Sequence, residues 1–464
     1  MKRFLSLLLA CAMVLGLCAC GNTDEPATVT LEVGYAKANI TPNQAVPLAG
    51  YGHTERRITA NFLDYLYATC IAFRWEEEVI LWYTQDLISS VWYSEARAAI
   101  SSATGVEPDR IMICATHTHS APDQNSSEPS IAAYKSIYLK GMTDAAVAAI
   151  EDLSPGKLYG GSATADLNFI RHYELNDGTF GGDNFGDWSS GIKGHAAEND
   201  PEMQLLKIER QGDKQDILIM NWQAHPCKTG GGTKIDISAD FIAGVRDAFE
   251  SQTDYLFAYF TGAAGNHNTS SRIAGEEKTM NKNQFGQELY AIAMAAMDSL
   301  QPIEGEGIRI TQVNFEADVN HDDEDKILQA RQVQDEWDKA GDTHAATALA
   351  RQLGLTSAFH ASAILARPGR PQRGAMEINA AYIAGFSFIT APFEMFAATG
   401  SYVKENSPYD ITFICSCANG AKSYIPTADA YEYGCYESYT SYFAKGTAEL
   451  VQEEYVEMLE DLKP

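Results

Sequence analysis

Two histidines near the middle of the first half of the chain have a type and spacing that could do chemistry. The segment Ile111–Ser120 is an apolar run that ends in His117, Thr118 and His119. Because residues i and i+2 of an extended strand point to the same side, this spacing predicts two imidazoles directed at one spot. The pair fits a metal site, or one ligand beside one acid or base. An ordinary polar strand end is the alternative.

Two further segments place a single ionisable side chain where an apolar run ends. His225 follows the run ILIM within NWQAHP, where a hydrogen-bonded core histidine is as good an explanation as a ligand. Glu394 ends the sequence APFE after the run FSFIT, and we expect it in the first turn of a helix. A carboxylate there would complement the helix dipole, or it would face a site at the strand end.

A tyrosine-rich stretch and a short basic motif are the remaining candidates. Tyr424–Glu437 contains Tyr424 and Tyr436 among other aromatic side chains, and such clusters usually pack against each other. Its proline, its glycine and its lack of alternation predict an ordered loop, a type of segment that often carries function. Arg171 and His172 lie in the motif NFIRHY, where exposed surface charge is the alternative.

The elements that must position these residues are strands and helices in mixed order. Strands are predicted at Tyr67–Phe73, Val79–Thr84, Arg110–Ala115, Asp216–Trp222, Tyr255–Phe260, Ile308–Phe315, Gly385–Thr390 and Ile411–Ile414. Helices are predicted at Ser94–Thr104, Ile131–Asp152, Ala239–Ser251, Lys282–Leu300 and Pro392–Asn406, with a charged helical excursion at Asp322–Leu353. This mixture favours an α/β fold with substantial sheet.

The N-terminal residues predict a bacterial lipoprotein signal. Lys2 and Arg3 precede the apolar run Phe4–Leu17, which is too short to span a bilayer as a helix. Ala19 then stands directly before Cys20, as in a lipobox, with a plain secretory signal as the alternative. The expected division is a signal peptide over residues 1–19, a lipidated cysteine and tether over 20–30, and one domain over 31–464.

Composition limits the partners. The chain has 34 Lys and Arg against 62 Asp and Glu, a formal net charge of −28. Such a charge repels nucleic acid and anionic headgroups, so we expect neither as a partner. The cysteines outside the signal region show no zinc-finger spacing, and their disulfide pairing cannot be read from sequence. Cys415 and Cys417 alternate along a strand-like run, which predicts burial.

The order of the motifs HxH, NWxxHP, PxE and SYxPT…Y resembles that of the neutral/alkaline (non-lysosomal) ceramidase family, over nearly all of residues 30–464. Further segments that resemble the family are Val33–Pro42, Pro47–Gly52, Asp64–Ala68, Tyr83–Asp86 and Thr116–Pro122. The resemblance implies an α/β fold of two stacked mixed β-sheets flanked by helices, with a metal at the base of a funnel-shaped pocket.

The resemblance also implies a zinc site. Its ligands would be His117, His225, Glu394 and Tyr424, of which the tyrosine is the unusual one. Two imidazoles, a carboxylate and a phenolic oxygen suit Zn²⁺ and leave room for water.

The same resemblance implies catalytic roles for three more residues. His119 would act as general base toward the water that zinc activates, and then as acid toward the leaving amine. Tyr436 and Arg171 would donate hydrogen bonds to the substrate or to the oxyanion of the tetrahedral intermediate.

We therefore expect a zinc-dependent amidohydrolase that cleaves the linear amide of a ceramide-like N-acyl lipid outside the cytoplasm, anchored by lipid to the bacterial cell membrane. The resemblance implies that Pro464 lies about where the family's catalytic domain stops, so we expect no C-terminal β-sandwich of the kind that the family's established enzymes carry. Thr261–Thr269 also departs from the family pattern. Both departures from the family bear on the identity of the substrate more than on the type of reaction. Two alternatives stay open: the same metal site acting on a non-sphingolipid amide or ester, and a lipid-anchored solute-binding protein without turnover. The oligomeric state is open as well.

Overall fold

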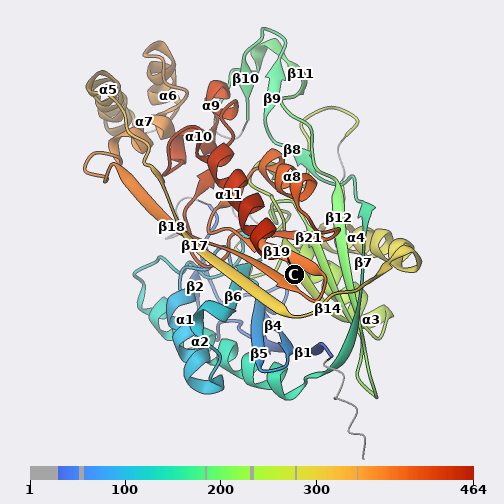
Figure 1. Ribbon diagram of the computed structural model, residues 1–464. Helices are drawn as coiled ribbons and strands as arrows, with labels where there is room; N and C mark the ends of the chain where they lie inside the picture. Colours follow the sequence, from blue (N-terminus) through green and yellow to red (C-terminus); the bar gives the residue numbers. More distant parts are fainter. Residues whose placement is uncertain are drawn as a thin grey trace, which may run out of the picture.

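The computed structural model describes residues 30–51, 57–182, 185–229, 235–276, 279–341 and 343–463. The expected signal peptide, Cys20 and nearly all of the tether lie outside the described residues. The described chain folds into two stacked β-sheets with helices on their outer faces (Figure 1).

The larger sheet is mixed. Its strands, in spatial order, are β14 (Leu256–Thr261), β13 (Ile217–Trp222), β12 (Glu202–Arg210), β7 (Ser154–Thr164), β1 (Glu32–Asn39), β4 (Tyr67–Trp75), β5 (Glu78–Gln85) and β6 (Ile111–Ala115), and β16 (Gln301–Ile303) pairs with β7. Most neighbours are antiparallel, but β13 pairs with β14 and β5 with β6 in parallel. Parallel pairing brings the carboxyl ends of β5 and β6 to one edge, and the HxH motif begins just past that edge.

The smaller sheet is also mixed. Its order is β17 (Ile308–Asp318), β18 (Arg373–Ile383), β19 (Phe386–Thr390) and β21 (Thr412–Cys415), with β19 and β21 parallel. Two-residue ladders complete the site region: β8 (Phe169–Ile170) pairs with β15 (His267–Asn268), and β20 (Glu394–Met395) with β22 (Tyr424–Ile425).

Apolar side chains from both faces of the central strands explain why these segments are strands. On β5, Leu81 and Tyr83 pack toward helices, whereas Ile80 and Trp82 pack toward the second sheet. Strands buried on both faces read as continuous apolar runs. The Trp82 ring stacks on Phe388 of the second sheet, with ring centroids 4.3 Å apart. The main core therefore lies between the two sheets.

Helices cover the outer faces. Against the larger sheet lie α1 (Tyr93–Thr104), α2 (Pro129–Glu151), α3 (Phe241–Gln252) and α4 (Lys282–Ala296), and against the smaller sheet α8 (Ala397–Asn406) and α11 (Thr447–Asp461). The predicted fold class, two stacked mixed sheets flanked by helices, is confirmed. The charged excursion forms α5 (Glu324–Ala340) and α6 (Thr343–Gln352), and the next helix, α7 (Ala358–Leu365), which was not predicted, shares a small apolar cluster with them (Figure 1).

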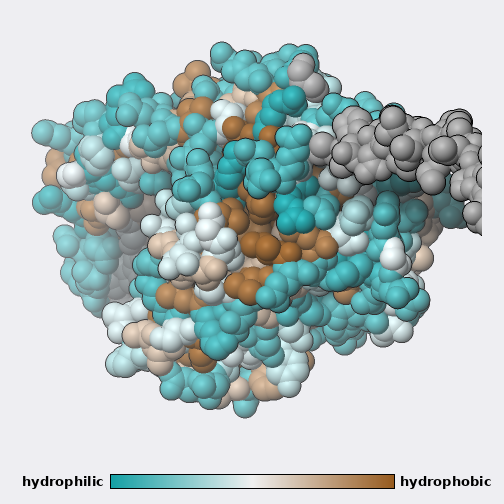
Figure 2. Space-filling model, turned by 60° about the horizontal axis from the view of Figure 1, so that its bottom comes forward, coloured by the Kyte–Doolittle hydropathy of each residue, from teal (hydrophilic) through white to brown (hydrophobic). Residues whose placement is uncertain are grey.

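The surface is mainly hydrophilic on the face drawn in Figure 2, with a band of apolar atoms across its middle. None of the helices in the described part of the chain is both long and apolar enough to cross a membrane. The cysteines outside the signal region are free thiols: Cys70, Cys114, Cys227, Cys415, Cys417 and Cys435. Cys415 and Cys417 are buried as predicted, but only Cys415 lies in a strand.

Candidate active site

His117 and His119 converge, although not for the reason that their spacing suggested. Strand β6 ends at Ala115, so neither histidine lies on an extended strand. His117 has φ 66°, a left-handed conformation that few non-glycine residues adopt and that clusters at functional sites. The Nε2 atoms of the two rings are 3.3 Å apart. The predicted convergence is confirmed, and the predicted strand geometry is wrong.

The buried His117 ring is oriented by its other nitrogen. Its Nδ1 lies 2.7 Å from the carbonyl oxygen of Ile88, and its backbone N–H donates to the carbonyl of Leu87 at 2.9 Å. An Nδ1–H donated to a carbonyl leaves the Nε2 lone pair for the site, the arrangement usual for metal-binding histidines. The Cys417 Sγ is 3.3 Å from the same Nδ1.

His225 is held in the same way in the loop after β13. Its Nδ1 lies 2.8 Å from the carbonyl oxygen of Ala264 and 3.0 Å from that of His267. Both carbonyls belong to the segment Thr261–Thr269, in which the sequence departs from the ceramidase pattern. That segment therefore orients a site histidine and is part of the site.

Glu394 reaches the histidines from a short strand, not from a helix. It begins β20, and its register partner in the parallel strand β22 is Tyr424. Helix α8 starts only at Ala397, so the expected helix start at Pro392 and the helix-dipole explanation are wrong. The Glu394 Oε2 lies 3.1 Å from the Nε2 of His117 and 3.1 Å from that of His225.

These side chains form a group that could hold a metal ion. Potential ligand atoms of His117, His119 and His225 all lie within 4.8 Å of one another. The Glu394 carboxylate joins two of them, and its backbone pairs with that of Tyr424, the fourth expected ligand. Imidazole and carboxylate donors around one point suit Zn²⁺, and backbone carbonyls hold the Nδ1 atoms of His117 and His225. The residues present therefore fit such an ion.

Electrostatics act differently on the three histidines: burial lowers the pKa of His225, whereas at His117 the effect of burial is outweighed by Cys417 and Glu394, which raise its pKa well above the ordinary value. Burial, together with the nearby His117 and His225, holds the pKa of His119 well below its ordinary value. Burial opposes ionisation of Glu394, but the two imidazoles outweigh it and hold the pKa of that carboxyl well below its ordinary value. At neutral pH the site therefore combines a carboxylate with a neutral His119, a form that can accept a proton.

Arg171 enters the site on a buried ionic cluster. Its Nε donates to the Glu437 Oε1 at 2.6 Å, and its Nη1 lies 3.4 Å from the Nε2 of His225. The other Glu437 oxygen is 2.8 Å from the Nε2 of His172. Both Arg171 and His172 are buried, so the surface-charge alternative is wrong. Sequence reasoning missed Glu437, whose one signal is its place directly after Tyr436.

The two tyrosines also lie together. The rings of Tyr424 and Tyr436 meet edge to face with centroids 5.8 Å apart, and the Arg171 guanidinium lies 5.4 Å from the centroid of Tyr424. The expected loop is in part helical, since it contains α9 (Ala430–Tyr433) and α10 (Tyr436–Thr440). Tyr436 begins α10, which fixes its position.

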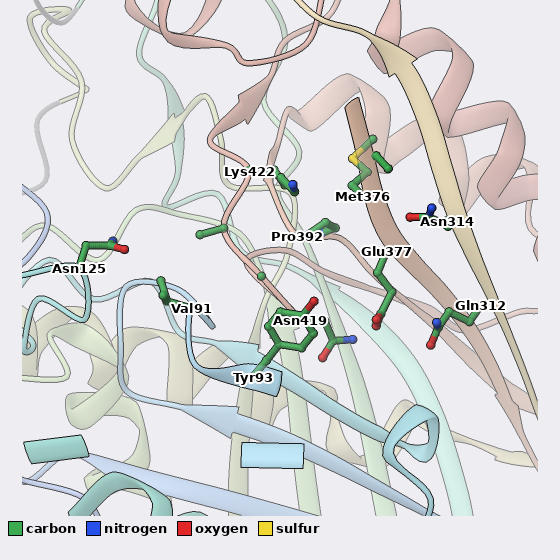
Figure 3. A pocket seen from close by; sticks show the side chains of 13 residues that line it. Val91, Tyr93, Asn125, Gln312, Asn314, Met376, Glu377, Pro392, Asn419 and Lys422 are labelled. Carbon is green, nitrogen blue, oxygen red and sulfur yellow. The ribbon is translucent and has the colours of Figure 1, made fainter. Parts of the chain in front are cut away.

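Two adjoining cavities lie beside this group. One, of about 200 Å³, is lined by His117, Glu394 and Cys417 among others. The second, of about 530 Å³, is shown in Figure 3 and shares part of its wall with the first.

Comparison with solved structures identifies the class of fold. A crystal structure of neutral ceramidase from Pseudomonas aeruginosa superposes with a TM-score of 0.68 at 18% sequence identity, covering 94% of this chain and 74% of that one. A structure of ceramidase complexed with C2 gives the same TM-score at 17% identity, covering 94% of this chain and 75% of that one. No family model and no curated protein sequence matches the chain. The chain thus has a neutral ceramidase-like fold.

Proposed function

We propose that this protein is a zinc-dependent hydrolase that cleaves the linear amide of an N-acyl lipid, releasing a fatty acid and an amine. The observation that carries the proposal is the convergence of His117, His225 and Glu394, with both His Nε2 atoms 3.1 Å from one carboxylate oxygen. The neutral ceramidase-like fold supports the same reaction class.

The proposed ligands are His117, His225, Glu394 and Tyr424. Zinc bound there would supply Lewis acidity and lower the pKa of a water molecule to roughly 7. The protein prepares the imidazoles for this by fixing their Nδ1 atoms on backbone carbonyls, so that no ring reorients when a ligand binds.

The remaining groups move the proton and hold the substrate. His119 accepts a proton from the attacking water and returns it to the nitrogen of the leaving amine, which its low pKa permits at neutral pH. Arg171 and Tyr436 donate hydrogen bonds toward the carbonyl oxygen as negative charge develops there, and each such donor is worth about 3 kcal/mol of activation energy.

Hydrolysis of an N-acyl panel tests this proposal. We expect the purified protein to release fatty acid from N-acyl amides, to lose activity with a chelator and to regain it with zinc. His119→Ala is expected to lower kcat by a hundredfold or more while keeping the metal. An active wild type whose His119→Ala variant turns over at the same rate would contradict the assigned proton transfer.

We also propose that the protein is anchored outside the cytoplasm through Cys20, which lies outside the described residues. The lipobox-like sequence before that residue supports this placement. Cys20→Ser is expected to shift the protein from the membrane fraction to the soluble fraction, and an unchanged distribution would contradict it.

A further inference from the structure

The larger cavity beside the site is polar. Its wall carries the amides of Asn125, Gln312 and Asn314 and the charged groups of Glu377 and Lys422 (Figure 3). Five of its residues also line the smaller cavity that contains His117 and Glu394: Asn125, Pro392, Gly420, Ala421 and Lys422. The two cavities therefore meet at a common wall, and a substrate whose amide lies at the site has polar surface beside it.

The two charges of this cavity are not equivalent. Glu377 is neutralised by Arg97, whose Nη1 and Nη2 donate to its two oxygens at 3.0 and 2.8 Å. Lys422 has no carboxylate within ion-pair distance among the described residues. Its ammonium lies 5.9 Å from the centroid of the Tyr442 ring. Among the described residues, a cation without an ion-pair partner thus lines both cavities, in a chain whose formal net charge is −28.

The backbone fixes this lysine relative to the proposed ligands. Lys422 precedes Tyr424 by two residues, and its N–H donates to the carbonyl of Pro392 at 2.6 Å. The N–H of Glu394 donates to the carbonyl of Ser423 at 2.9 Å. The same hydrogen bonds that align β20 with β22 therefore hold the lysine beside the site.

The loop that leads to Lys422 is equally constrained. Cys417, Asn419 and Ser423 have φ of 55°, 52° and 60°, conformations that persist only where the surroundings enforce them. The Asn419 N–H donates to the carbonyl of Ile113, and its Oδ1 accepts from the N–H of the same residue, both at 2.9 Å. The backbone of this loop is therefore held in one conformation, which fixes the starting point of the Lys422 side chain.

From this arrangement we propose that Lys422 binds an anionic group of the substrate, so that the hydrolysed amides are N-acyl compounds with a carboxylate or phosphate near the scissile bond. The inference rests on the proposed function and narrows its substrate class. A charge-assisted hydrogen bond from an ammonium to a carboxylate or phosphate is about twice as strong as a neutral one, and the neighbouring amides supply further donors. With N-decanoylglycine, water would add across the C–N bond to give decanoate and glycine.

Two substrates of equal chain length test the proposal. N-decanoylglycine carries a carboxylate and N-decanoylethanolamine a neutral hydroxyl, while phosphorylated N-decanoylethanolamine separates phosphate from carboxylate recognition. We expect the wild type to prefer an anionic member. In Lys422→Gln the ratio of kcat/KM for the anionic to the neutral substrate should fall by about tenfold or more. Lys422→Arg should retain most of the preference.

A matched control is Lys463→Gln, because Lys463 pairs with Glu460 near the end of α11 and lines neither cavity. Lys463→Gln should leave the ratio of kcat/KM for the anionic to the neutral substrate unchanged. If the wild type hydrolyses the panel but Lys422→Gln shows the wild-type ratio, the anion site is wrong and the proposed function stands.

Calorimetric titration distinguishes a failure of the anion site from a failure of the proposed function. Metal-free protein is titrated with N-decanoylglycine, and we expect affinity to drop about tenfold in Lys422→Gln. Suppose that the wild type hydrolyses no member of the panel, and that Lys422→Gln still binds N-decanoylglycine about tenfold more weakly. The proposed function then fails and the anion site stands. Equal or absent binding in wild type and variant, without a change in substrate ratio, overturns the anion site.

Discussion

Glu437 shows most clearly how much of the site depends on residues that never touch the substrate. Its carboxylate is 1% exposed and lies between Arg171 and His172. Burial raises the pKa of this carboxyl, but the Arg171 guanidinium and the hydrogen-bonded His172 ring have the larger, opposite effect, so that the pKa falls well below its ordinary value. The charge that holds Arg171 in place is therefore kept even in acid.

Removing that charge is expected to cost stability. Glu437→Gln leaves a buried guanidinium without its counterion, and we expect the free energy of unfolding at pH 7 to fall by about 3 kcal/mol. Chemical denaturation at pH 7 measures it. Glu432→Gln on the exposed face of α9 is the matched control, because its partner Lys445 lies at the surface. A loss as small as that of the control would contradict the ionic role.

The pH dependence has a definite sign. A carboxyl with a depressed folded-state pKa contributes stability that is fully present above its unfolded value of about 4.3 and is lost as the pH falls toward the folded value. The advantage of wild type over Glu437→Gln should therefore be constant from pH 6 to 7 and shrink below about pH 4. Thermal midpoints of both proteins across this range measure it. An advantage that grows in acid would contradict the assignment.

At the scale of elements, the apolar runs predicted β4, β5, β6, β13, β14, β17, β19 and β21 and most of the long helices, because burial on both faces leaves little choice of residue. They did not predict β1, β12 and β18, in which polar residues interrupt the apolar ones. β7 was not predicted, because its sequence SPGKLYGGSAT has few apolar residues and its pairing depends on neighbours distant in the chain. The left-handed conformation of His117 and the β20–β22 ladder were not predicted either, because contacts between distant parts of the chain enforce both. The candidate ligands were predicted from the order of the motifs. The contact between Glu437 and Arg171 could not be predicted in this way, because the two residues are 266 positions apart in the chain.

The loop around Gly50 provides a test of how precisely His119 must be placed. Gly50 has φ +99°, and a Cβ there would come within 2.6 Å of the His119 Cβ and 2.7 Å of its Cα. Gly50→Ala should therefore displace His119 and lower kcat by at least tenfold, with zinc retained. Steady-state kinetics beside metal analysis measure both effects.

The control for that variant is Gly105→Ala. Gly105 also has a positive φ of +77°, but a Cβ there would meet nothing within 4 Å. It shares the backbone strain without the clash, so kcat should be unchanged. Equal losses of kcat in the two variants would assign the effect to strain and not to His119.

At the scale of the whole molecule, the site depends on the stacking of two sheets. His117 follows the larger sheet, while Glu394 and Tyr424 follow strands of the smaller one. Trp82 lies between the sheets, stacked on Phe260 and Phe388 with centroids 3.8 and 4.3 Å away. Packing of this residue therefore fixes the distance between the two halves of the proposed metal site.

Trp82→Ala should lower the free energy of unfolding by about 3–5 kcal/mol, because it leaves a cavity between the sheets. It should also weaken zinc binding, since the ligands lie on both sides of that cavity. Thermal unfolding with and without zinc measures both effects. A stability loss with unchanged zinc affinity would show that the ligand loops hold their geometry without the sheet contact.

The most direct test of the central claim is the metal content of the purified protein after growth with zinc supplied, beside His117→Ala/His225→Ala. We expect about one zinc per chain in the wild type and none in the variant, with circular dichroism showing that the variant is folded. A wild type without zinc, or a folded variant that keeps its zinc, would contradict the metal site on which the proposed hydrolysis rests.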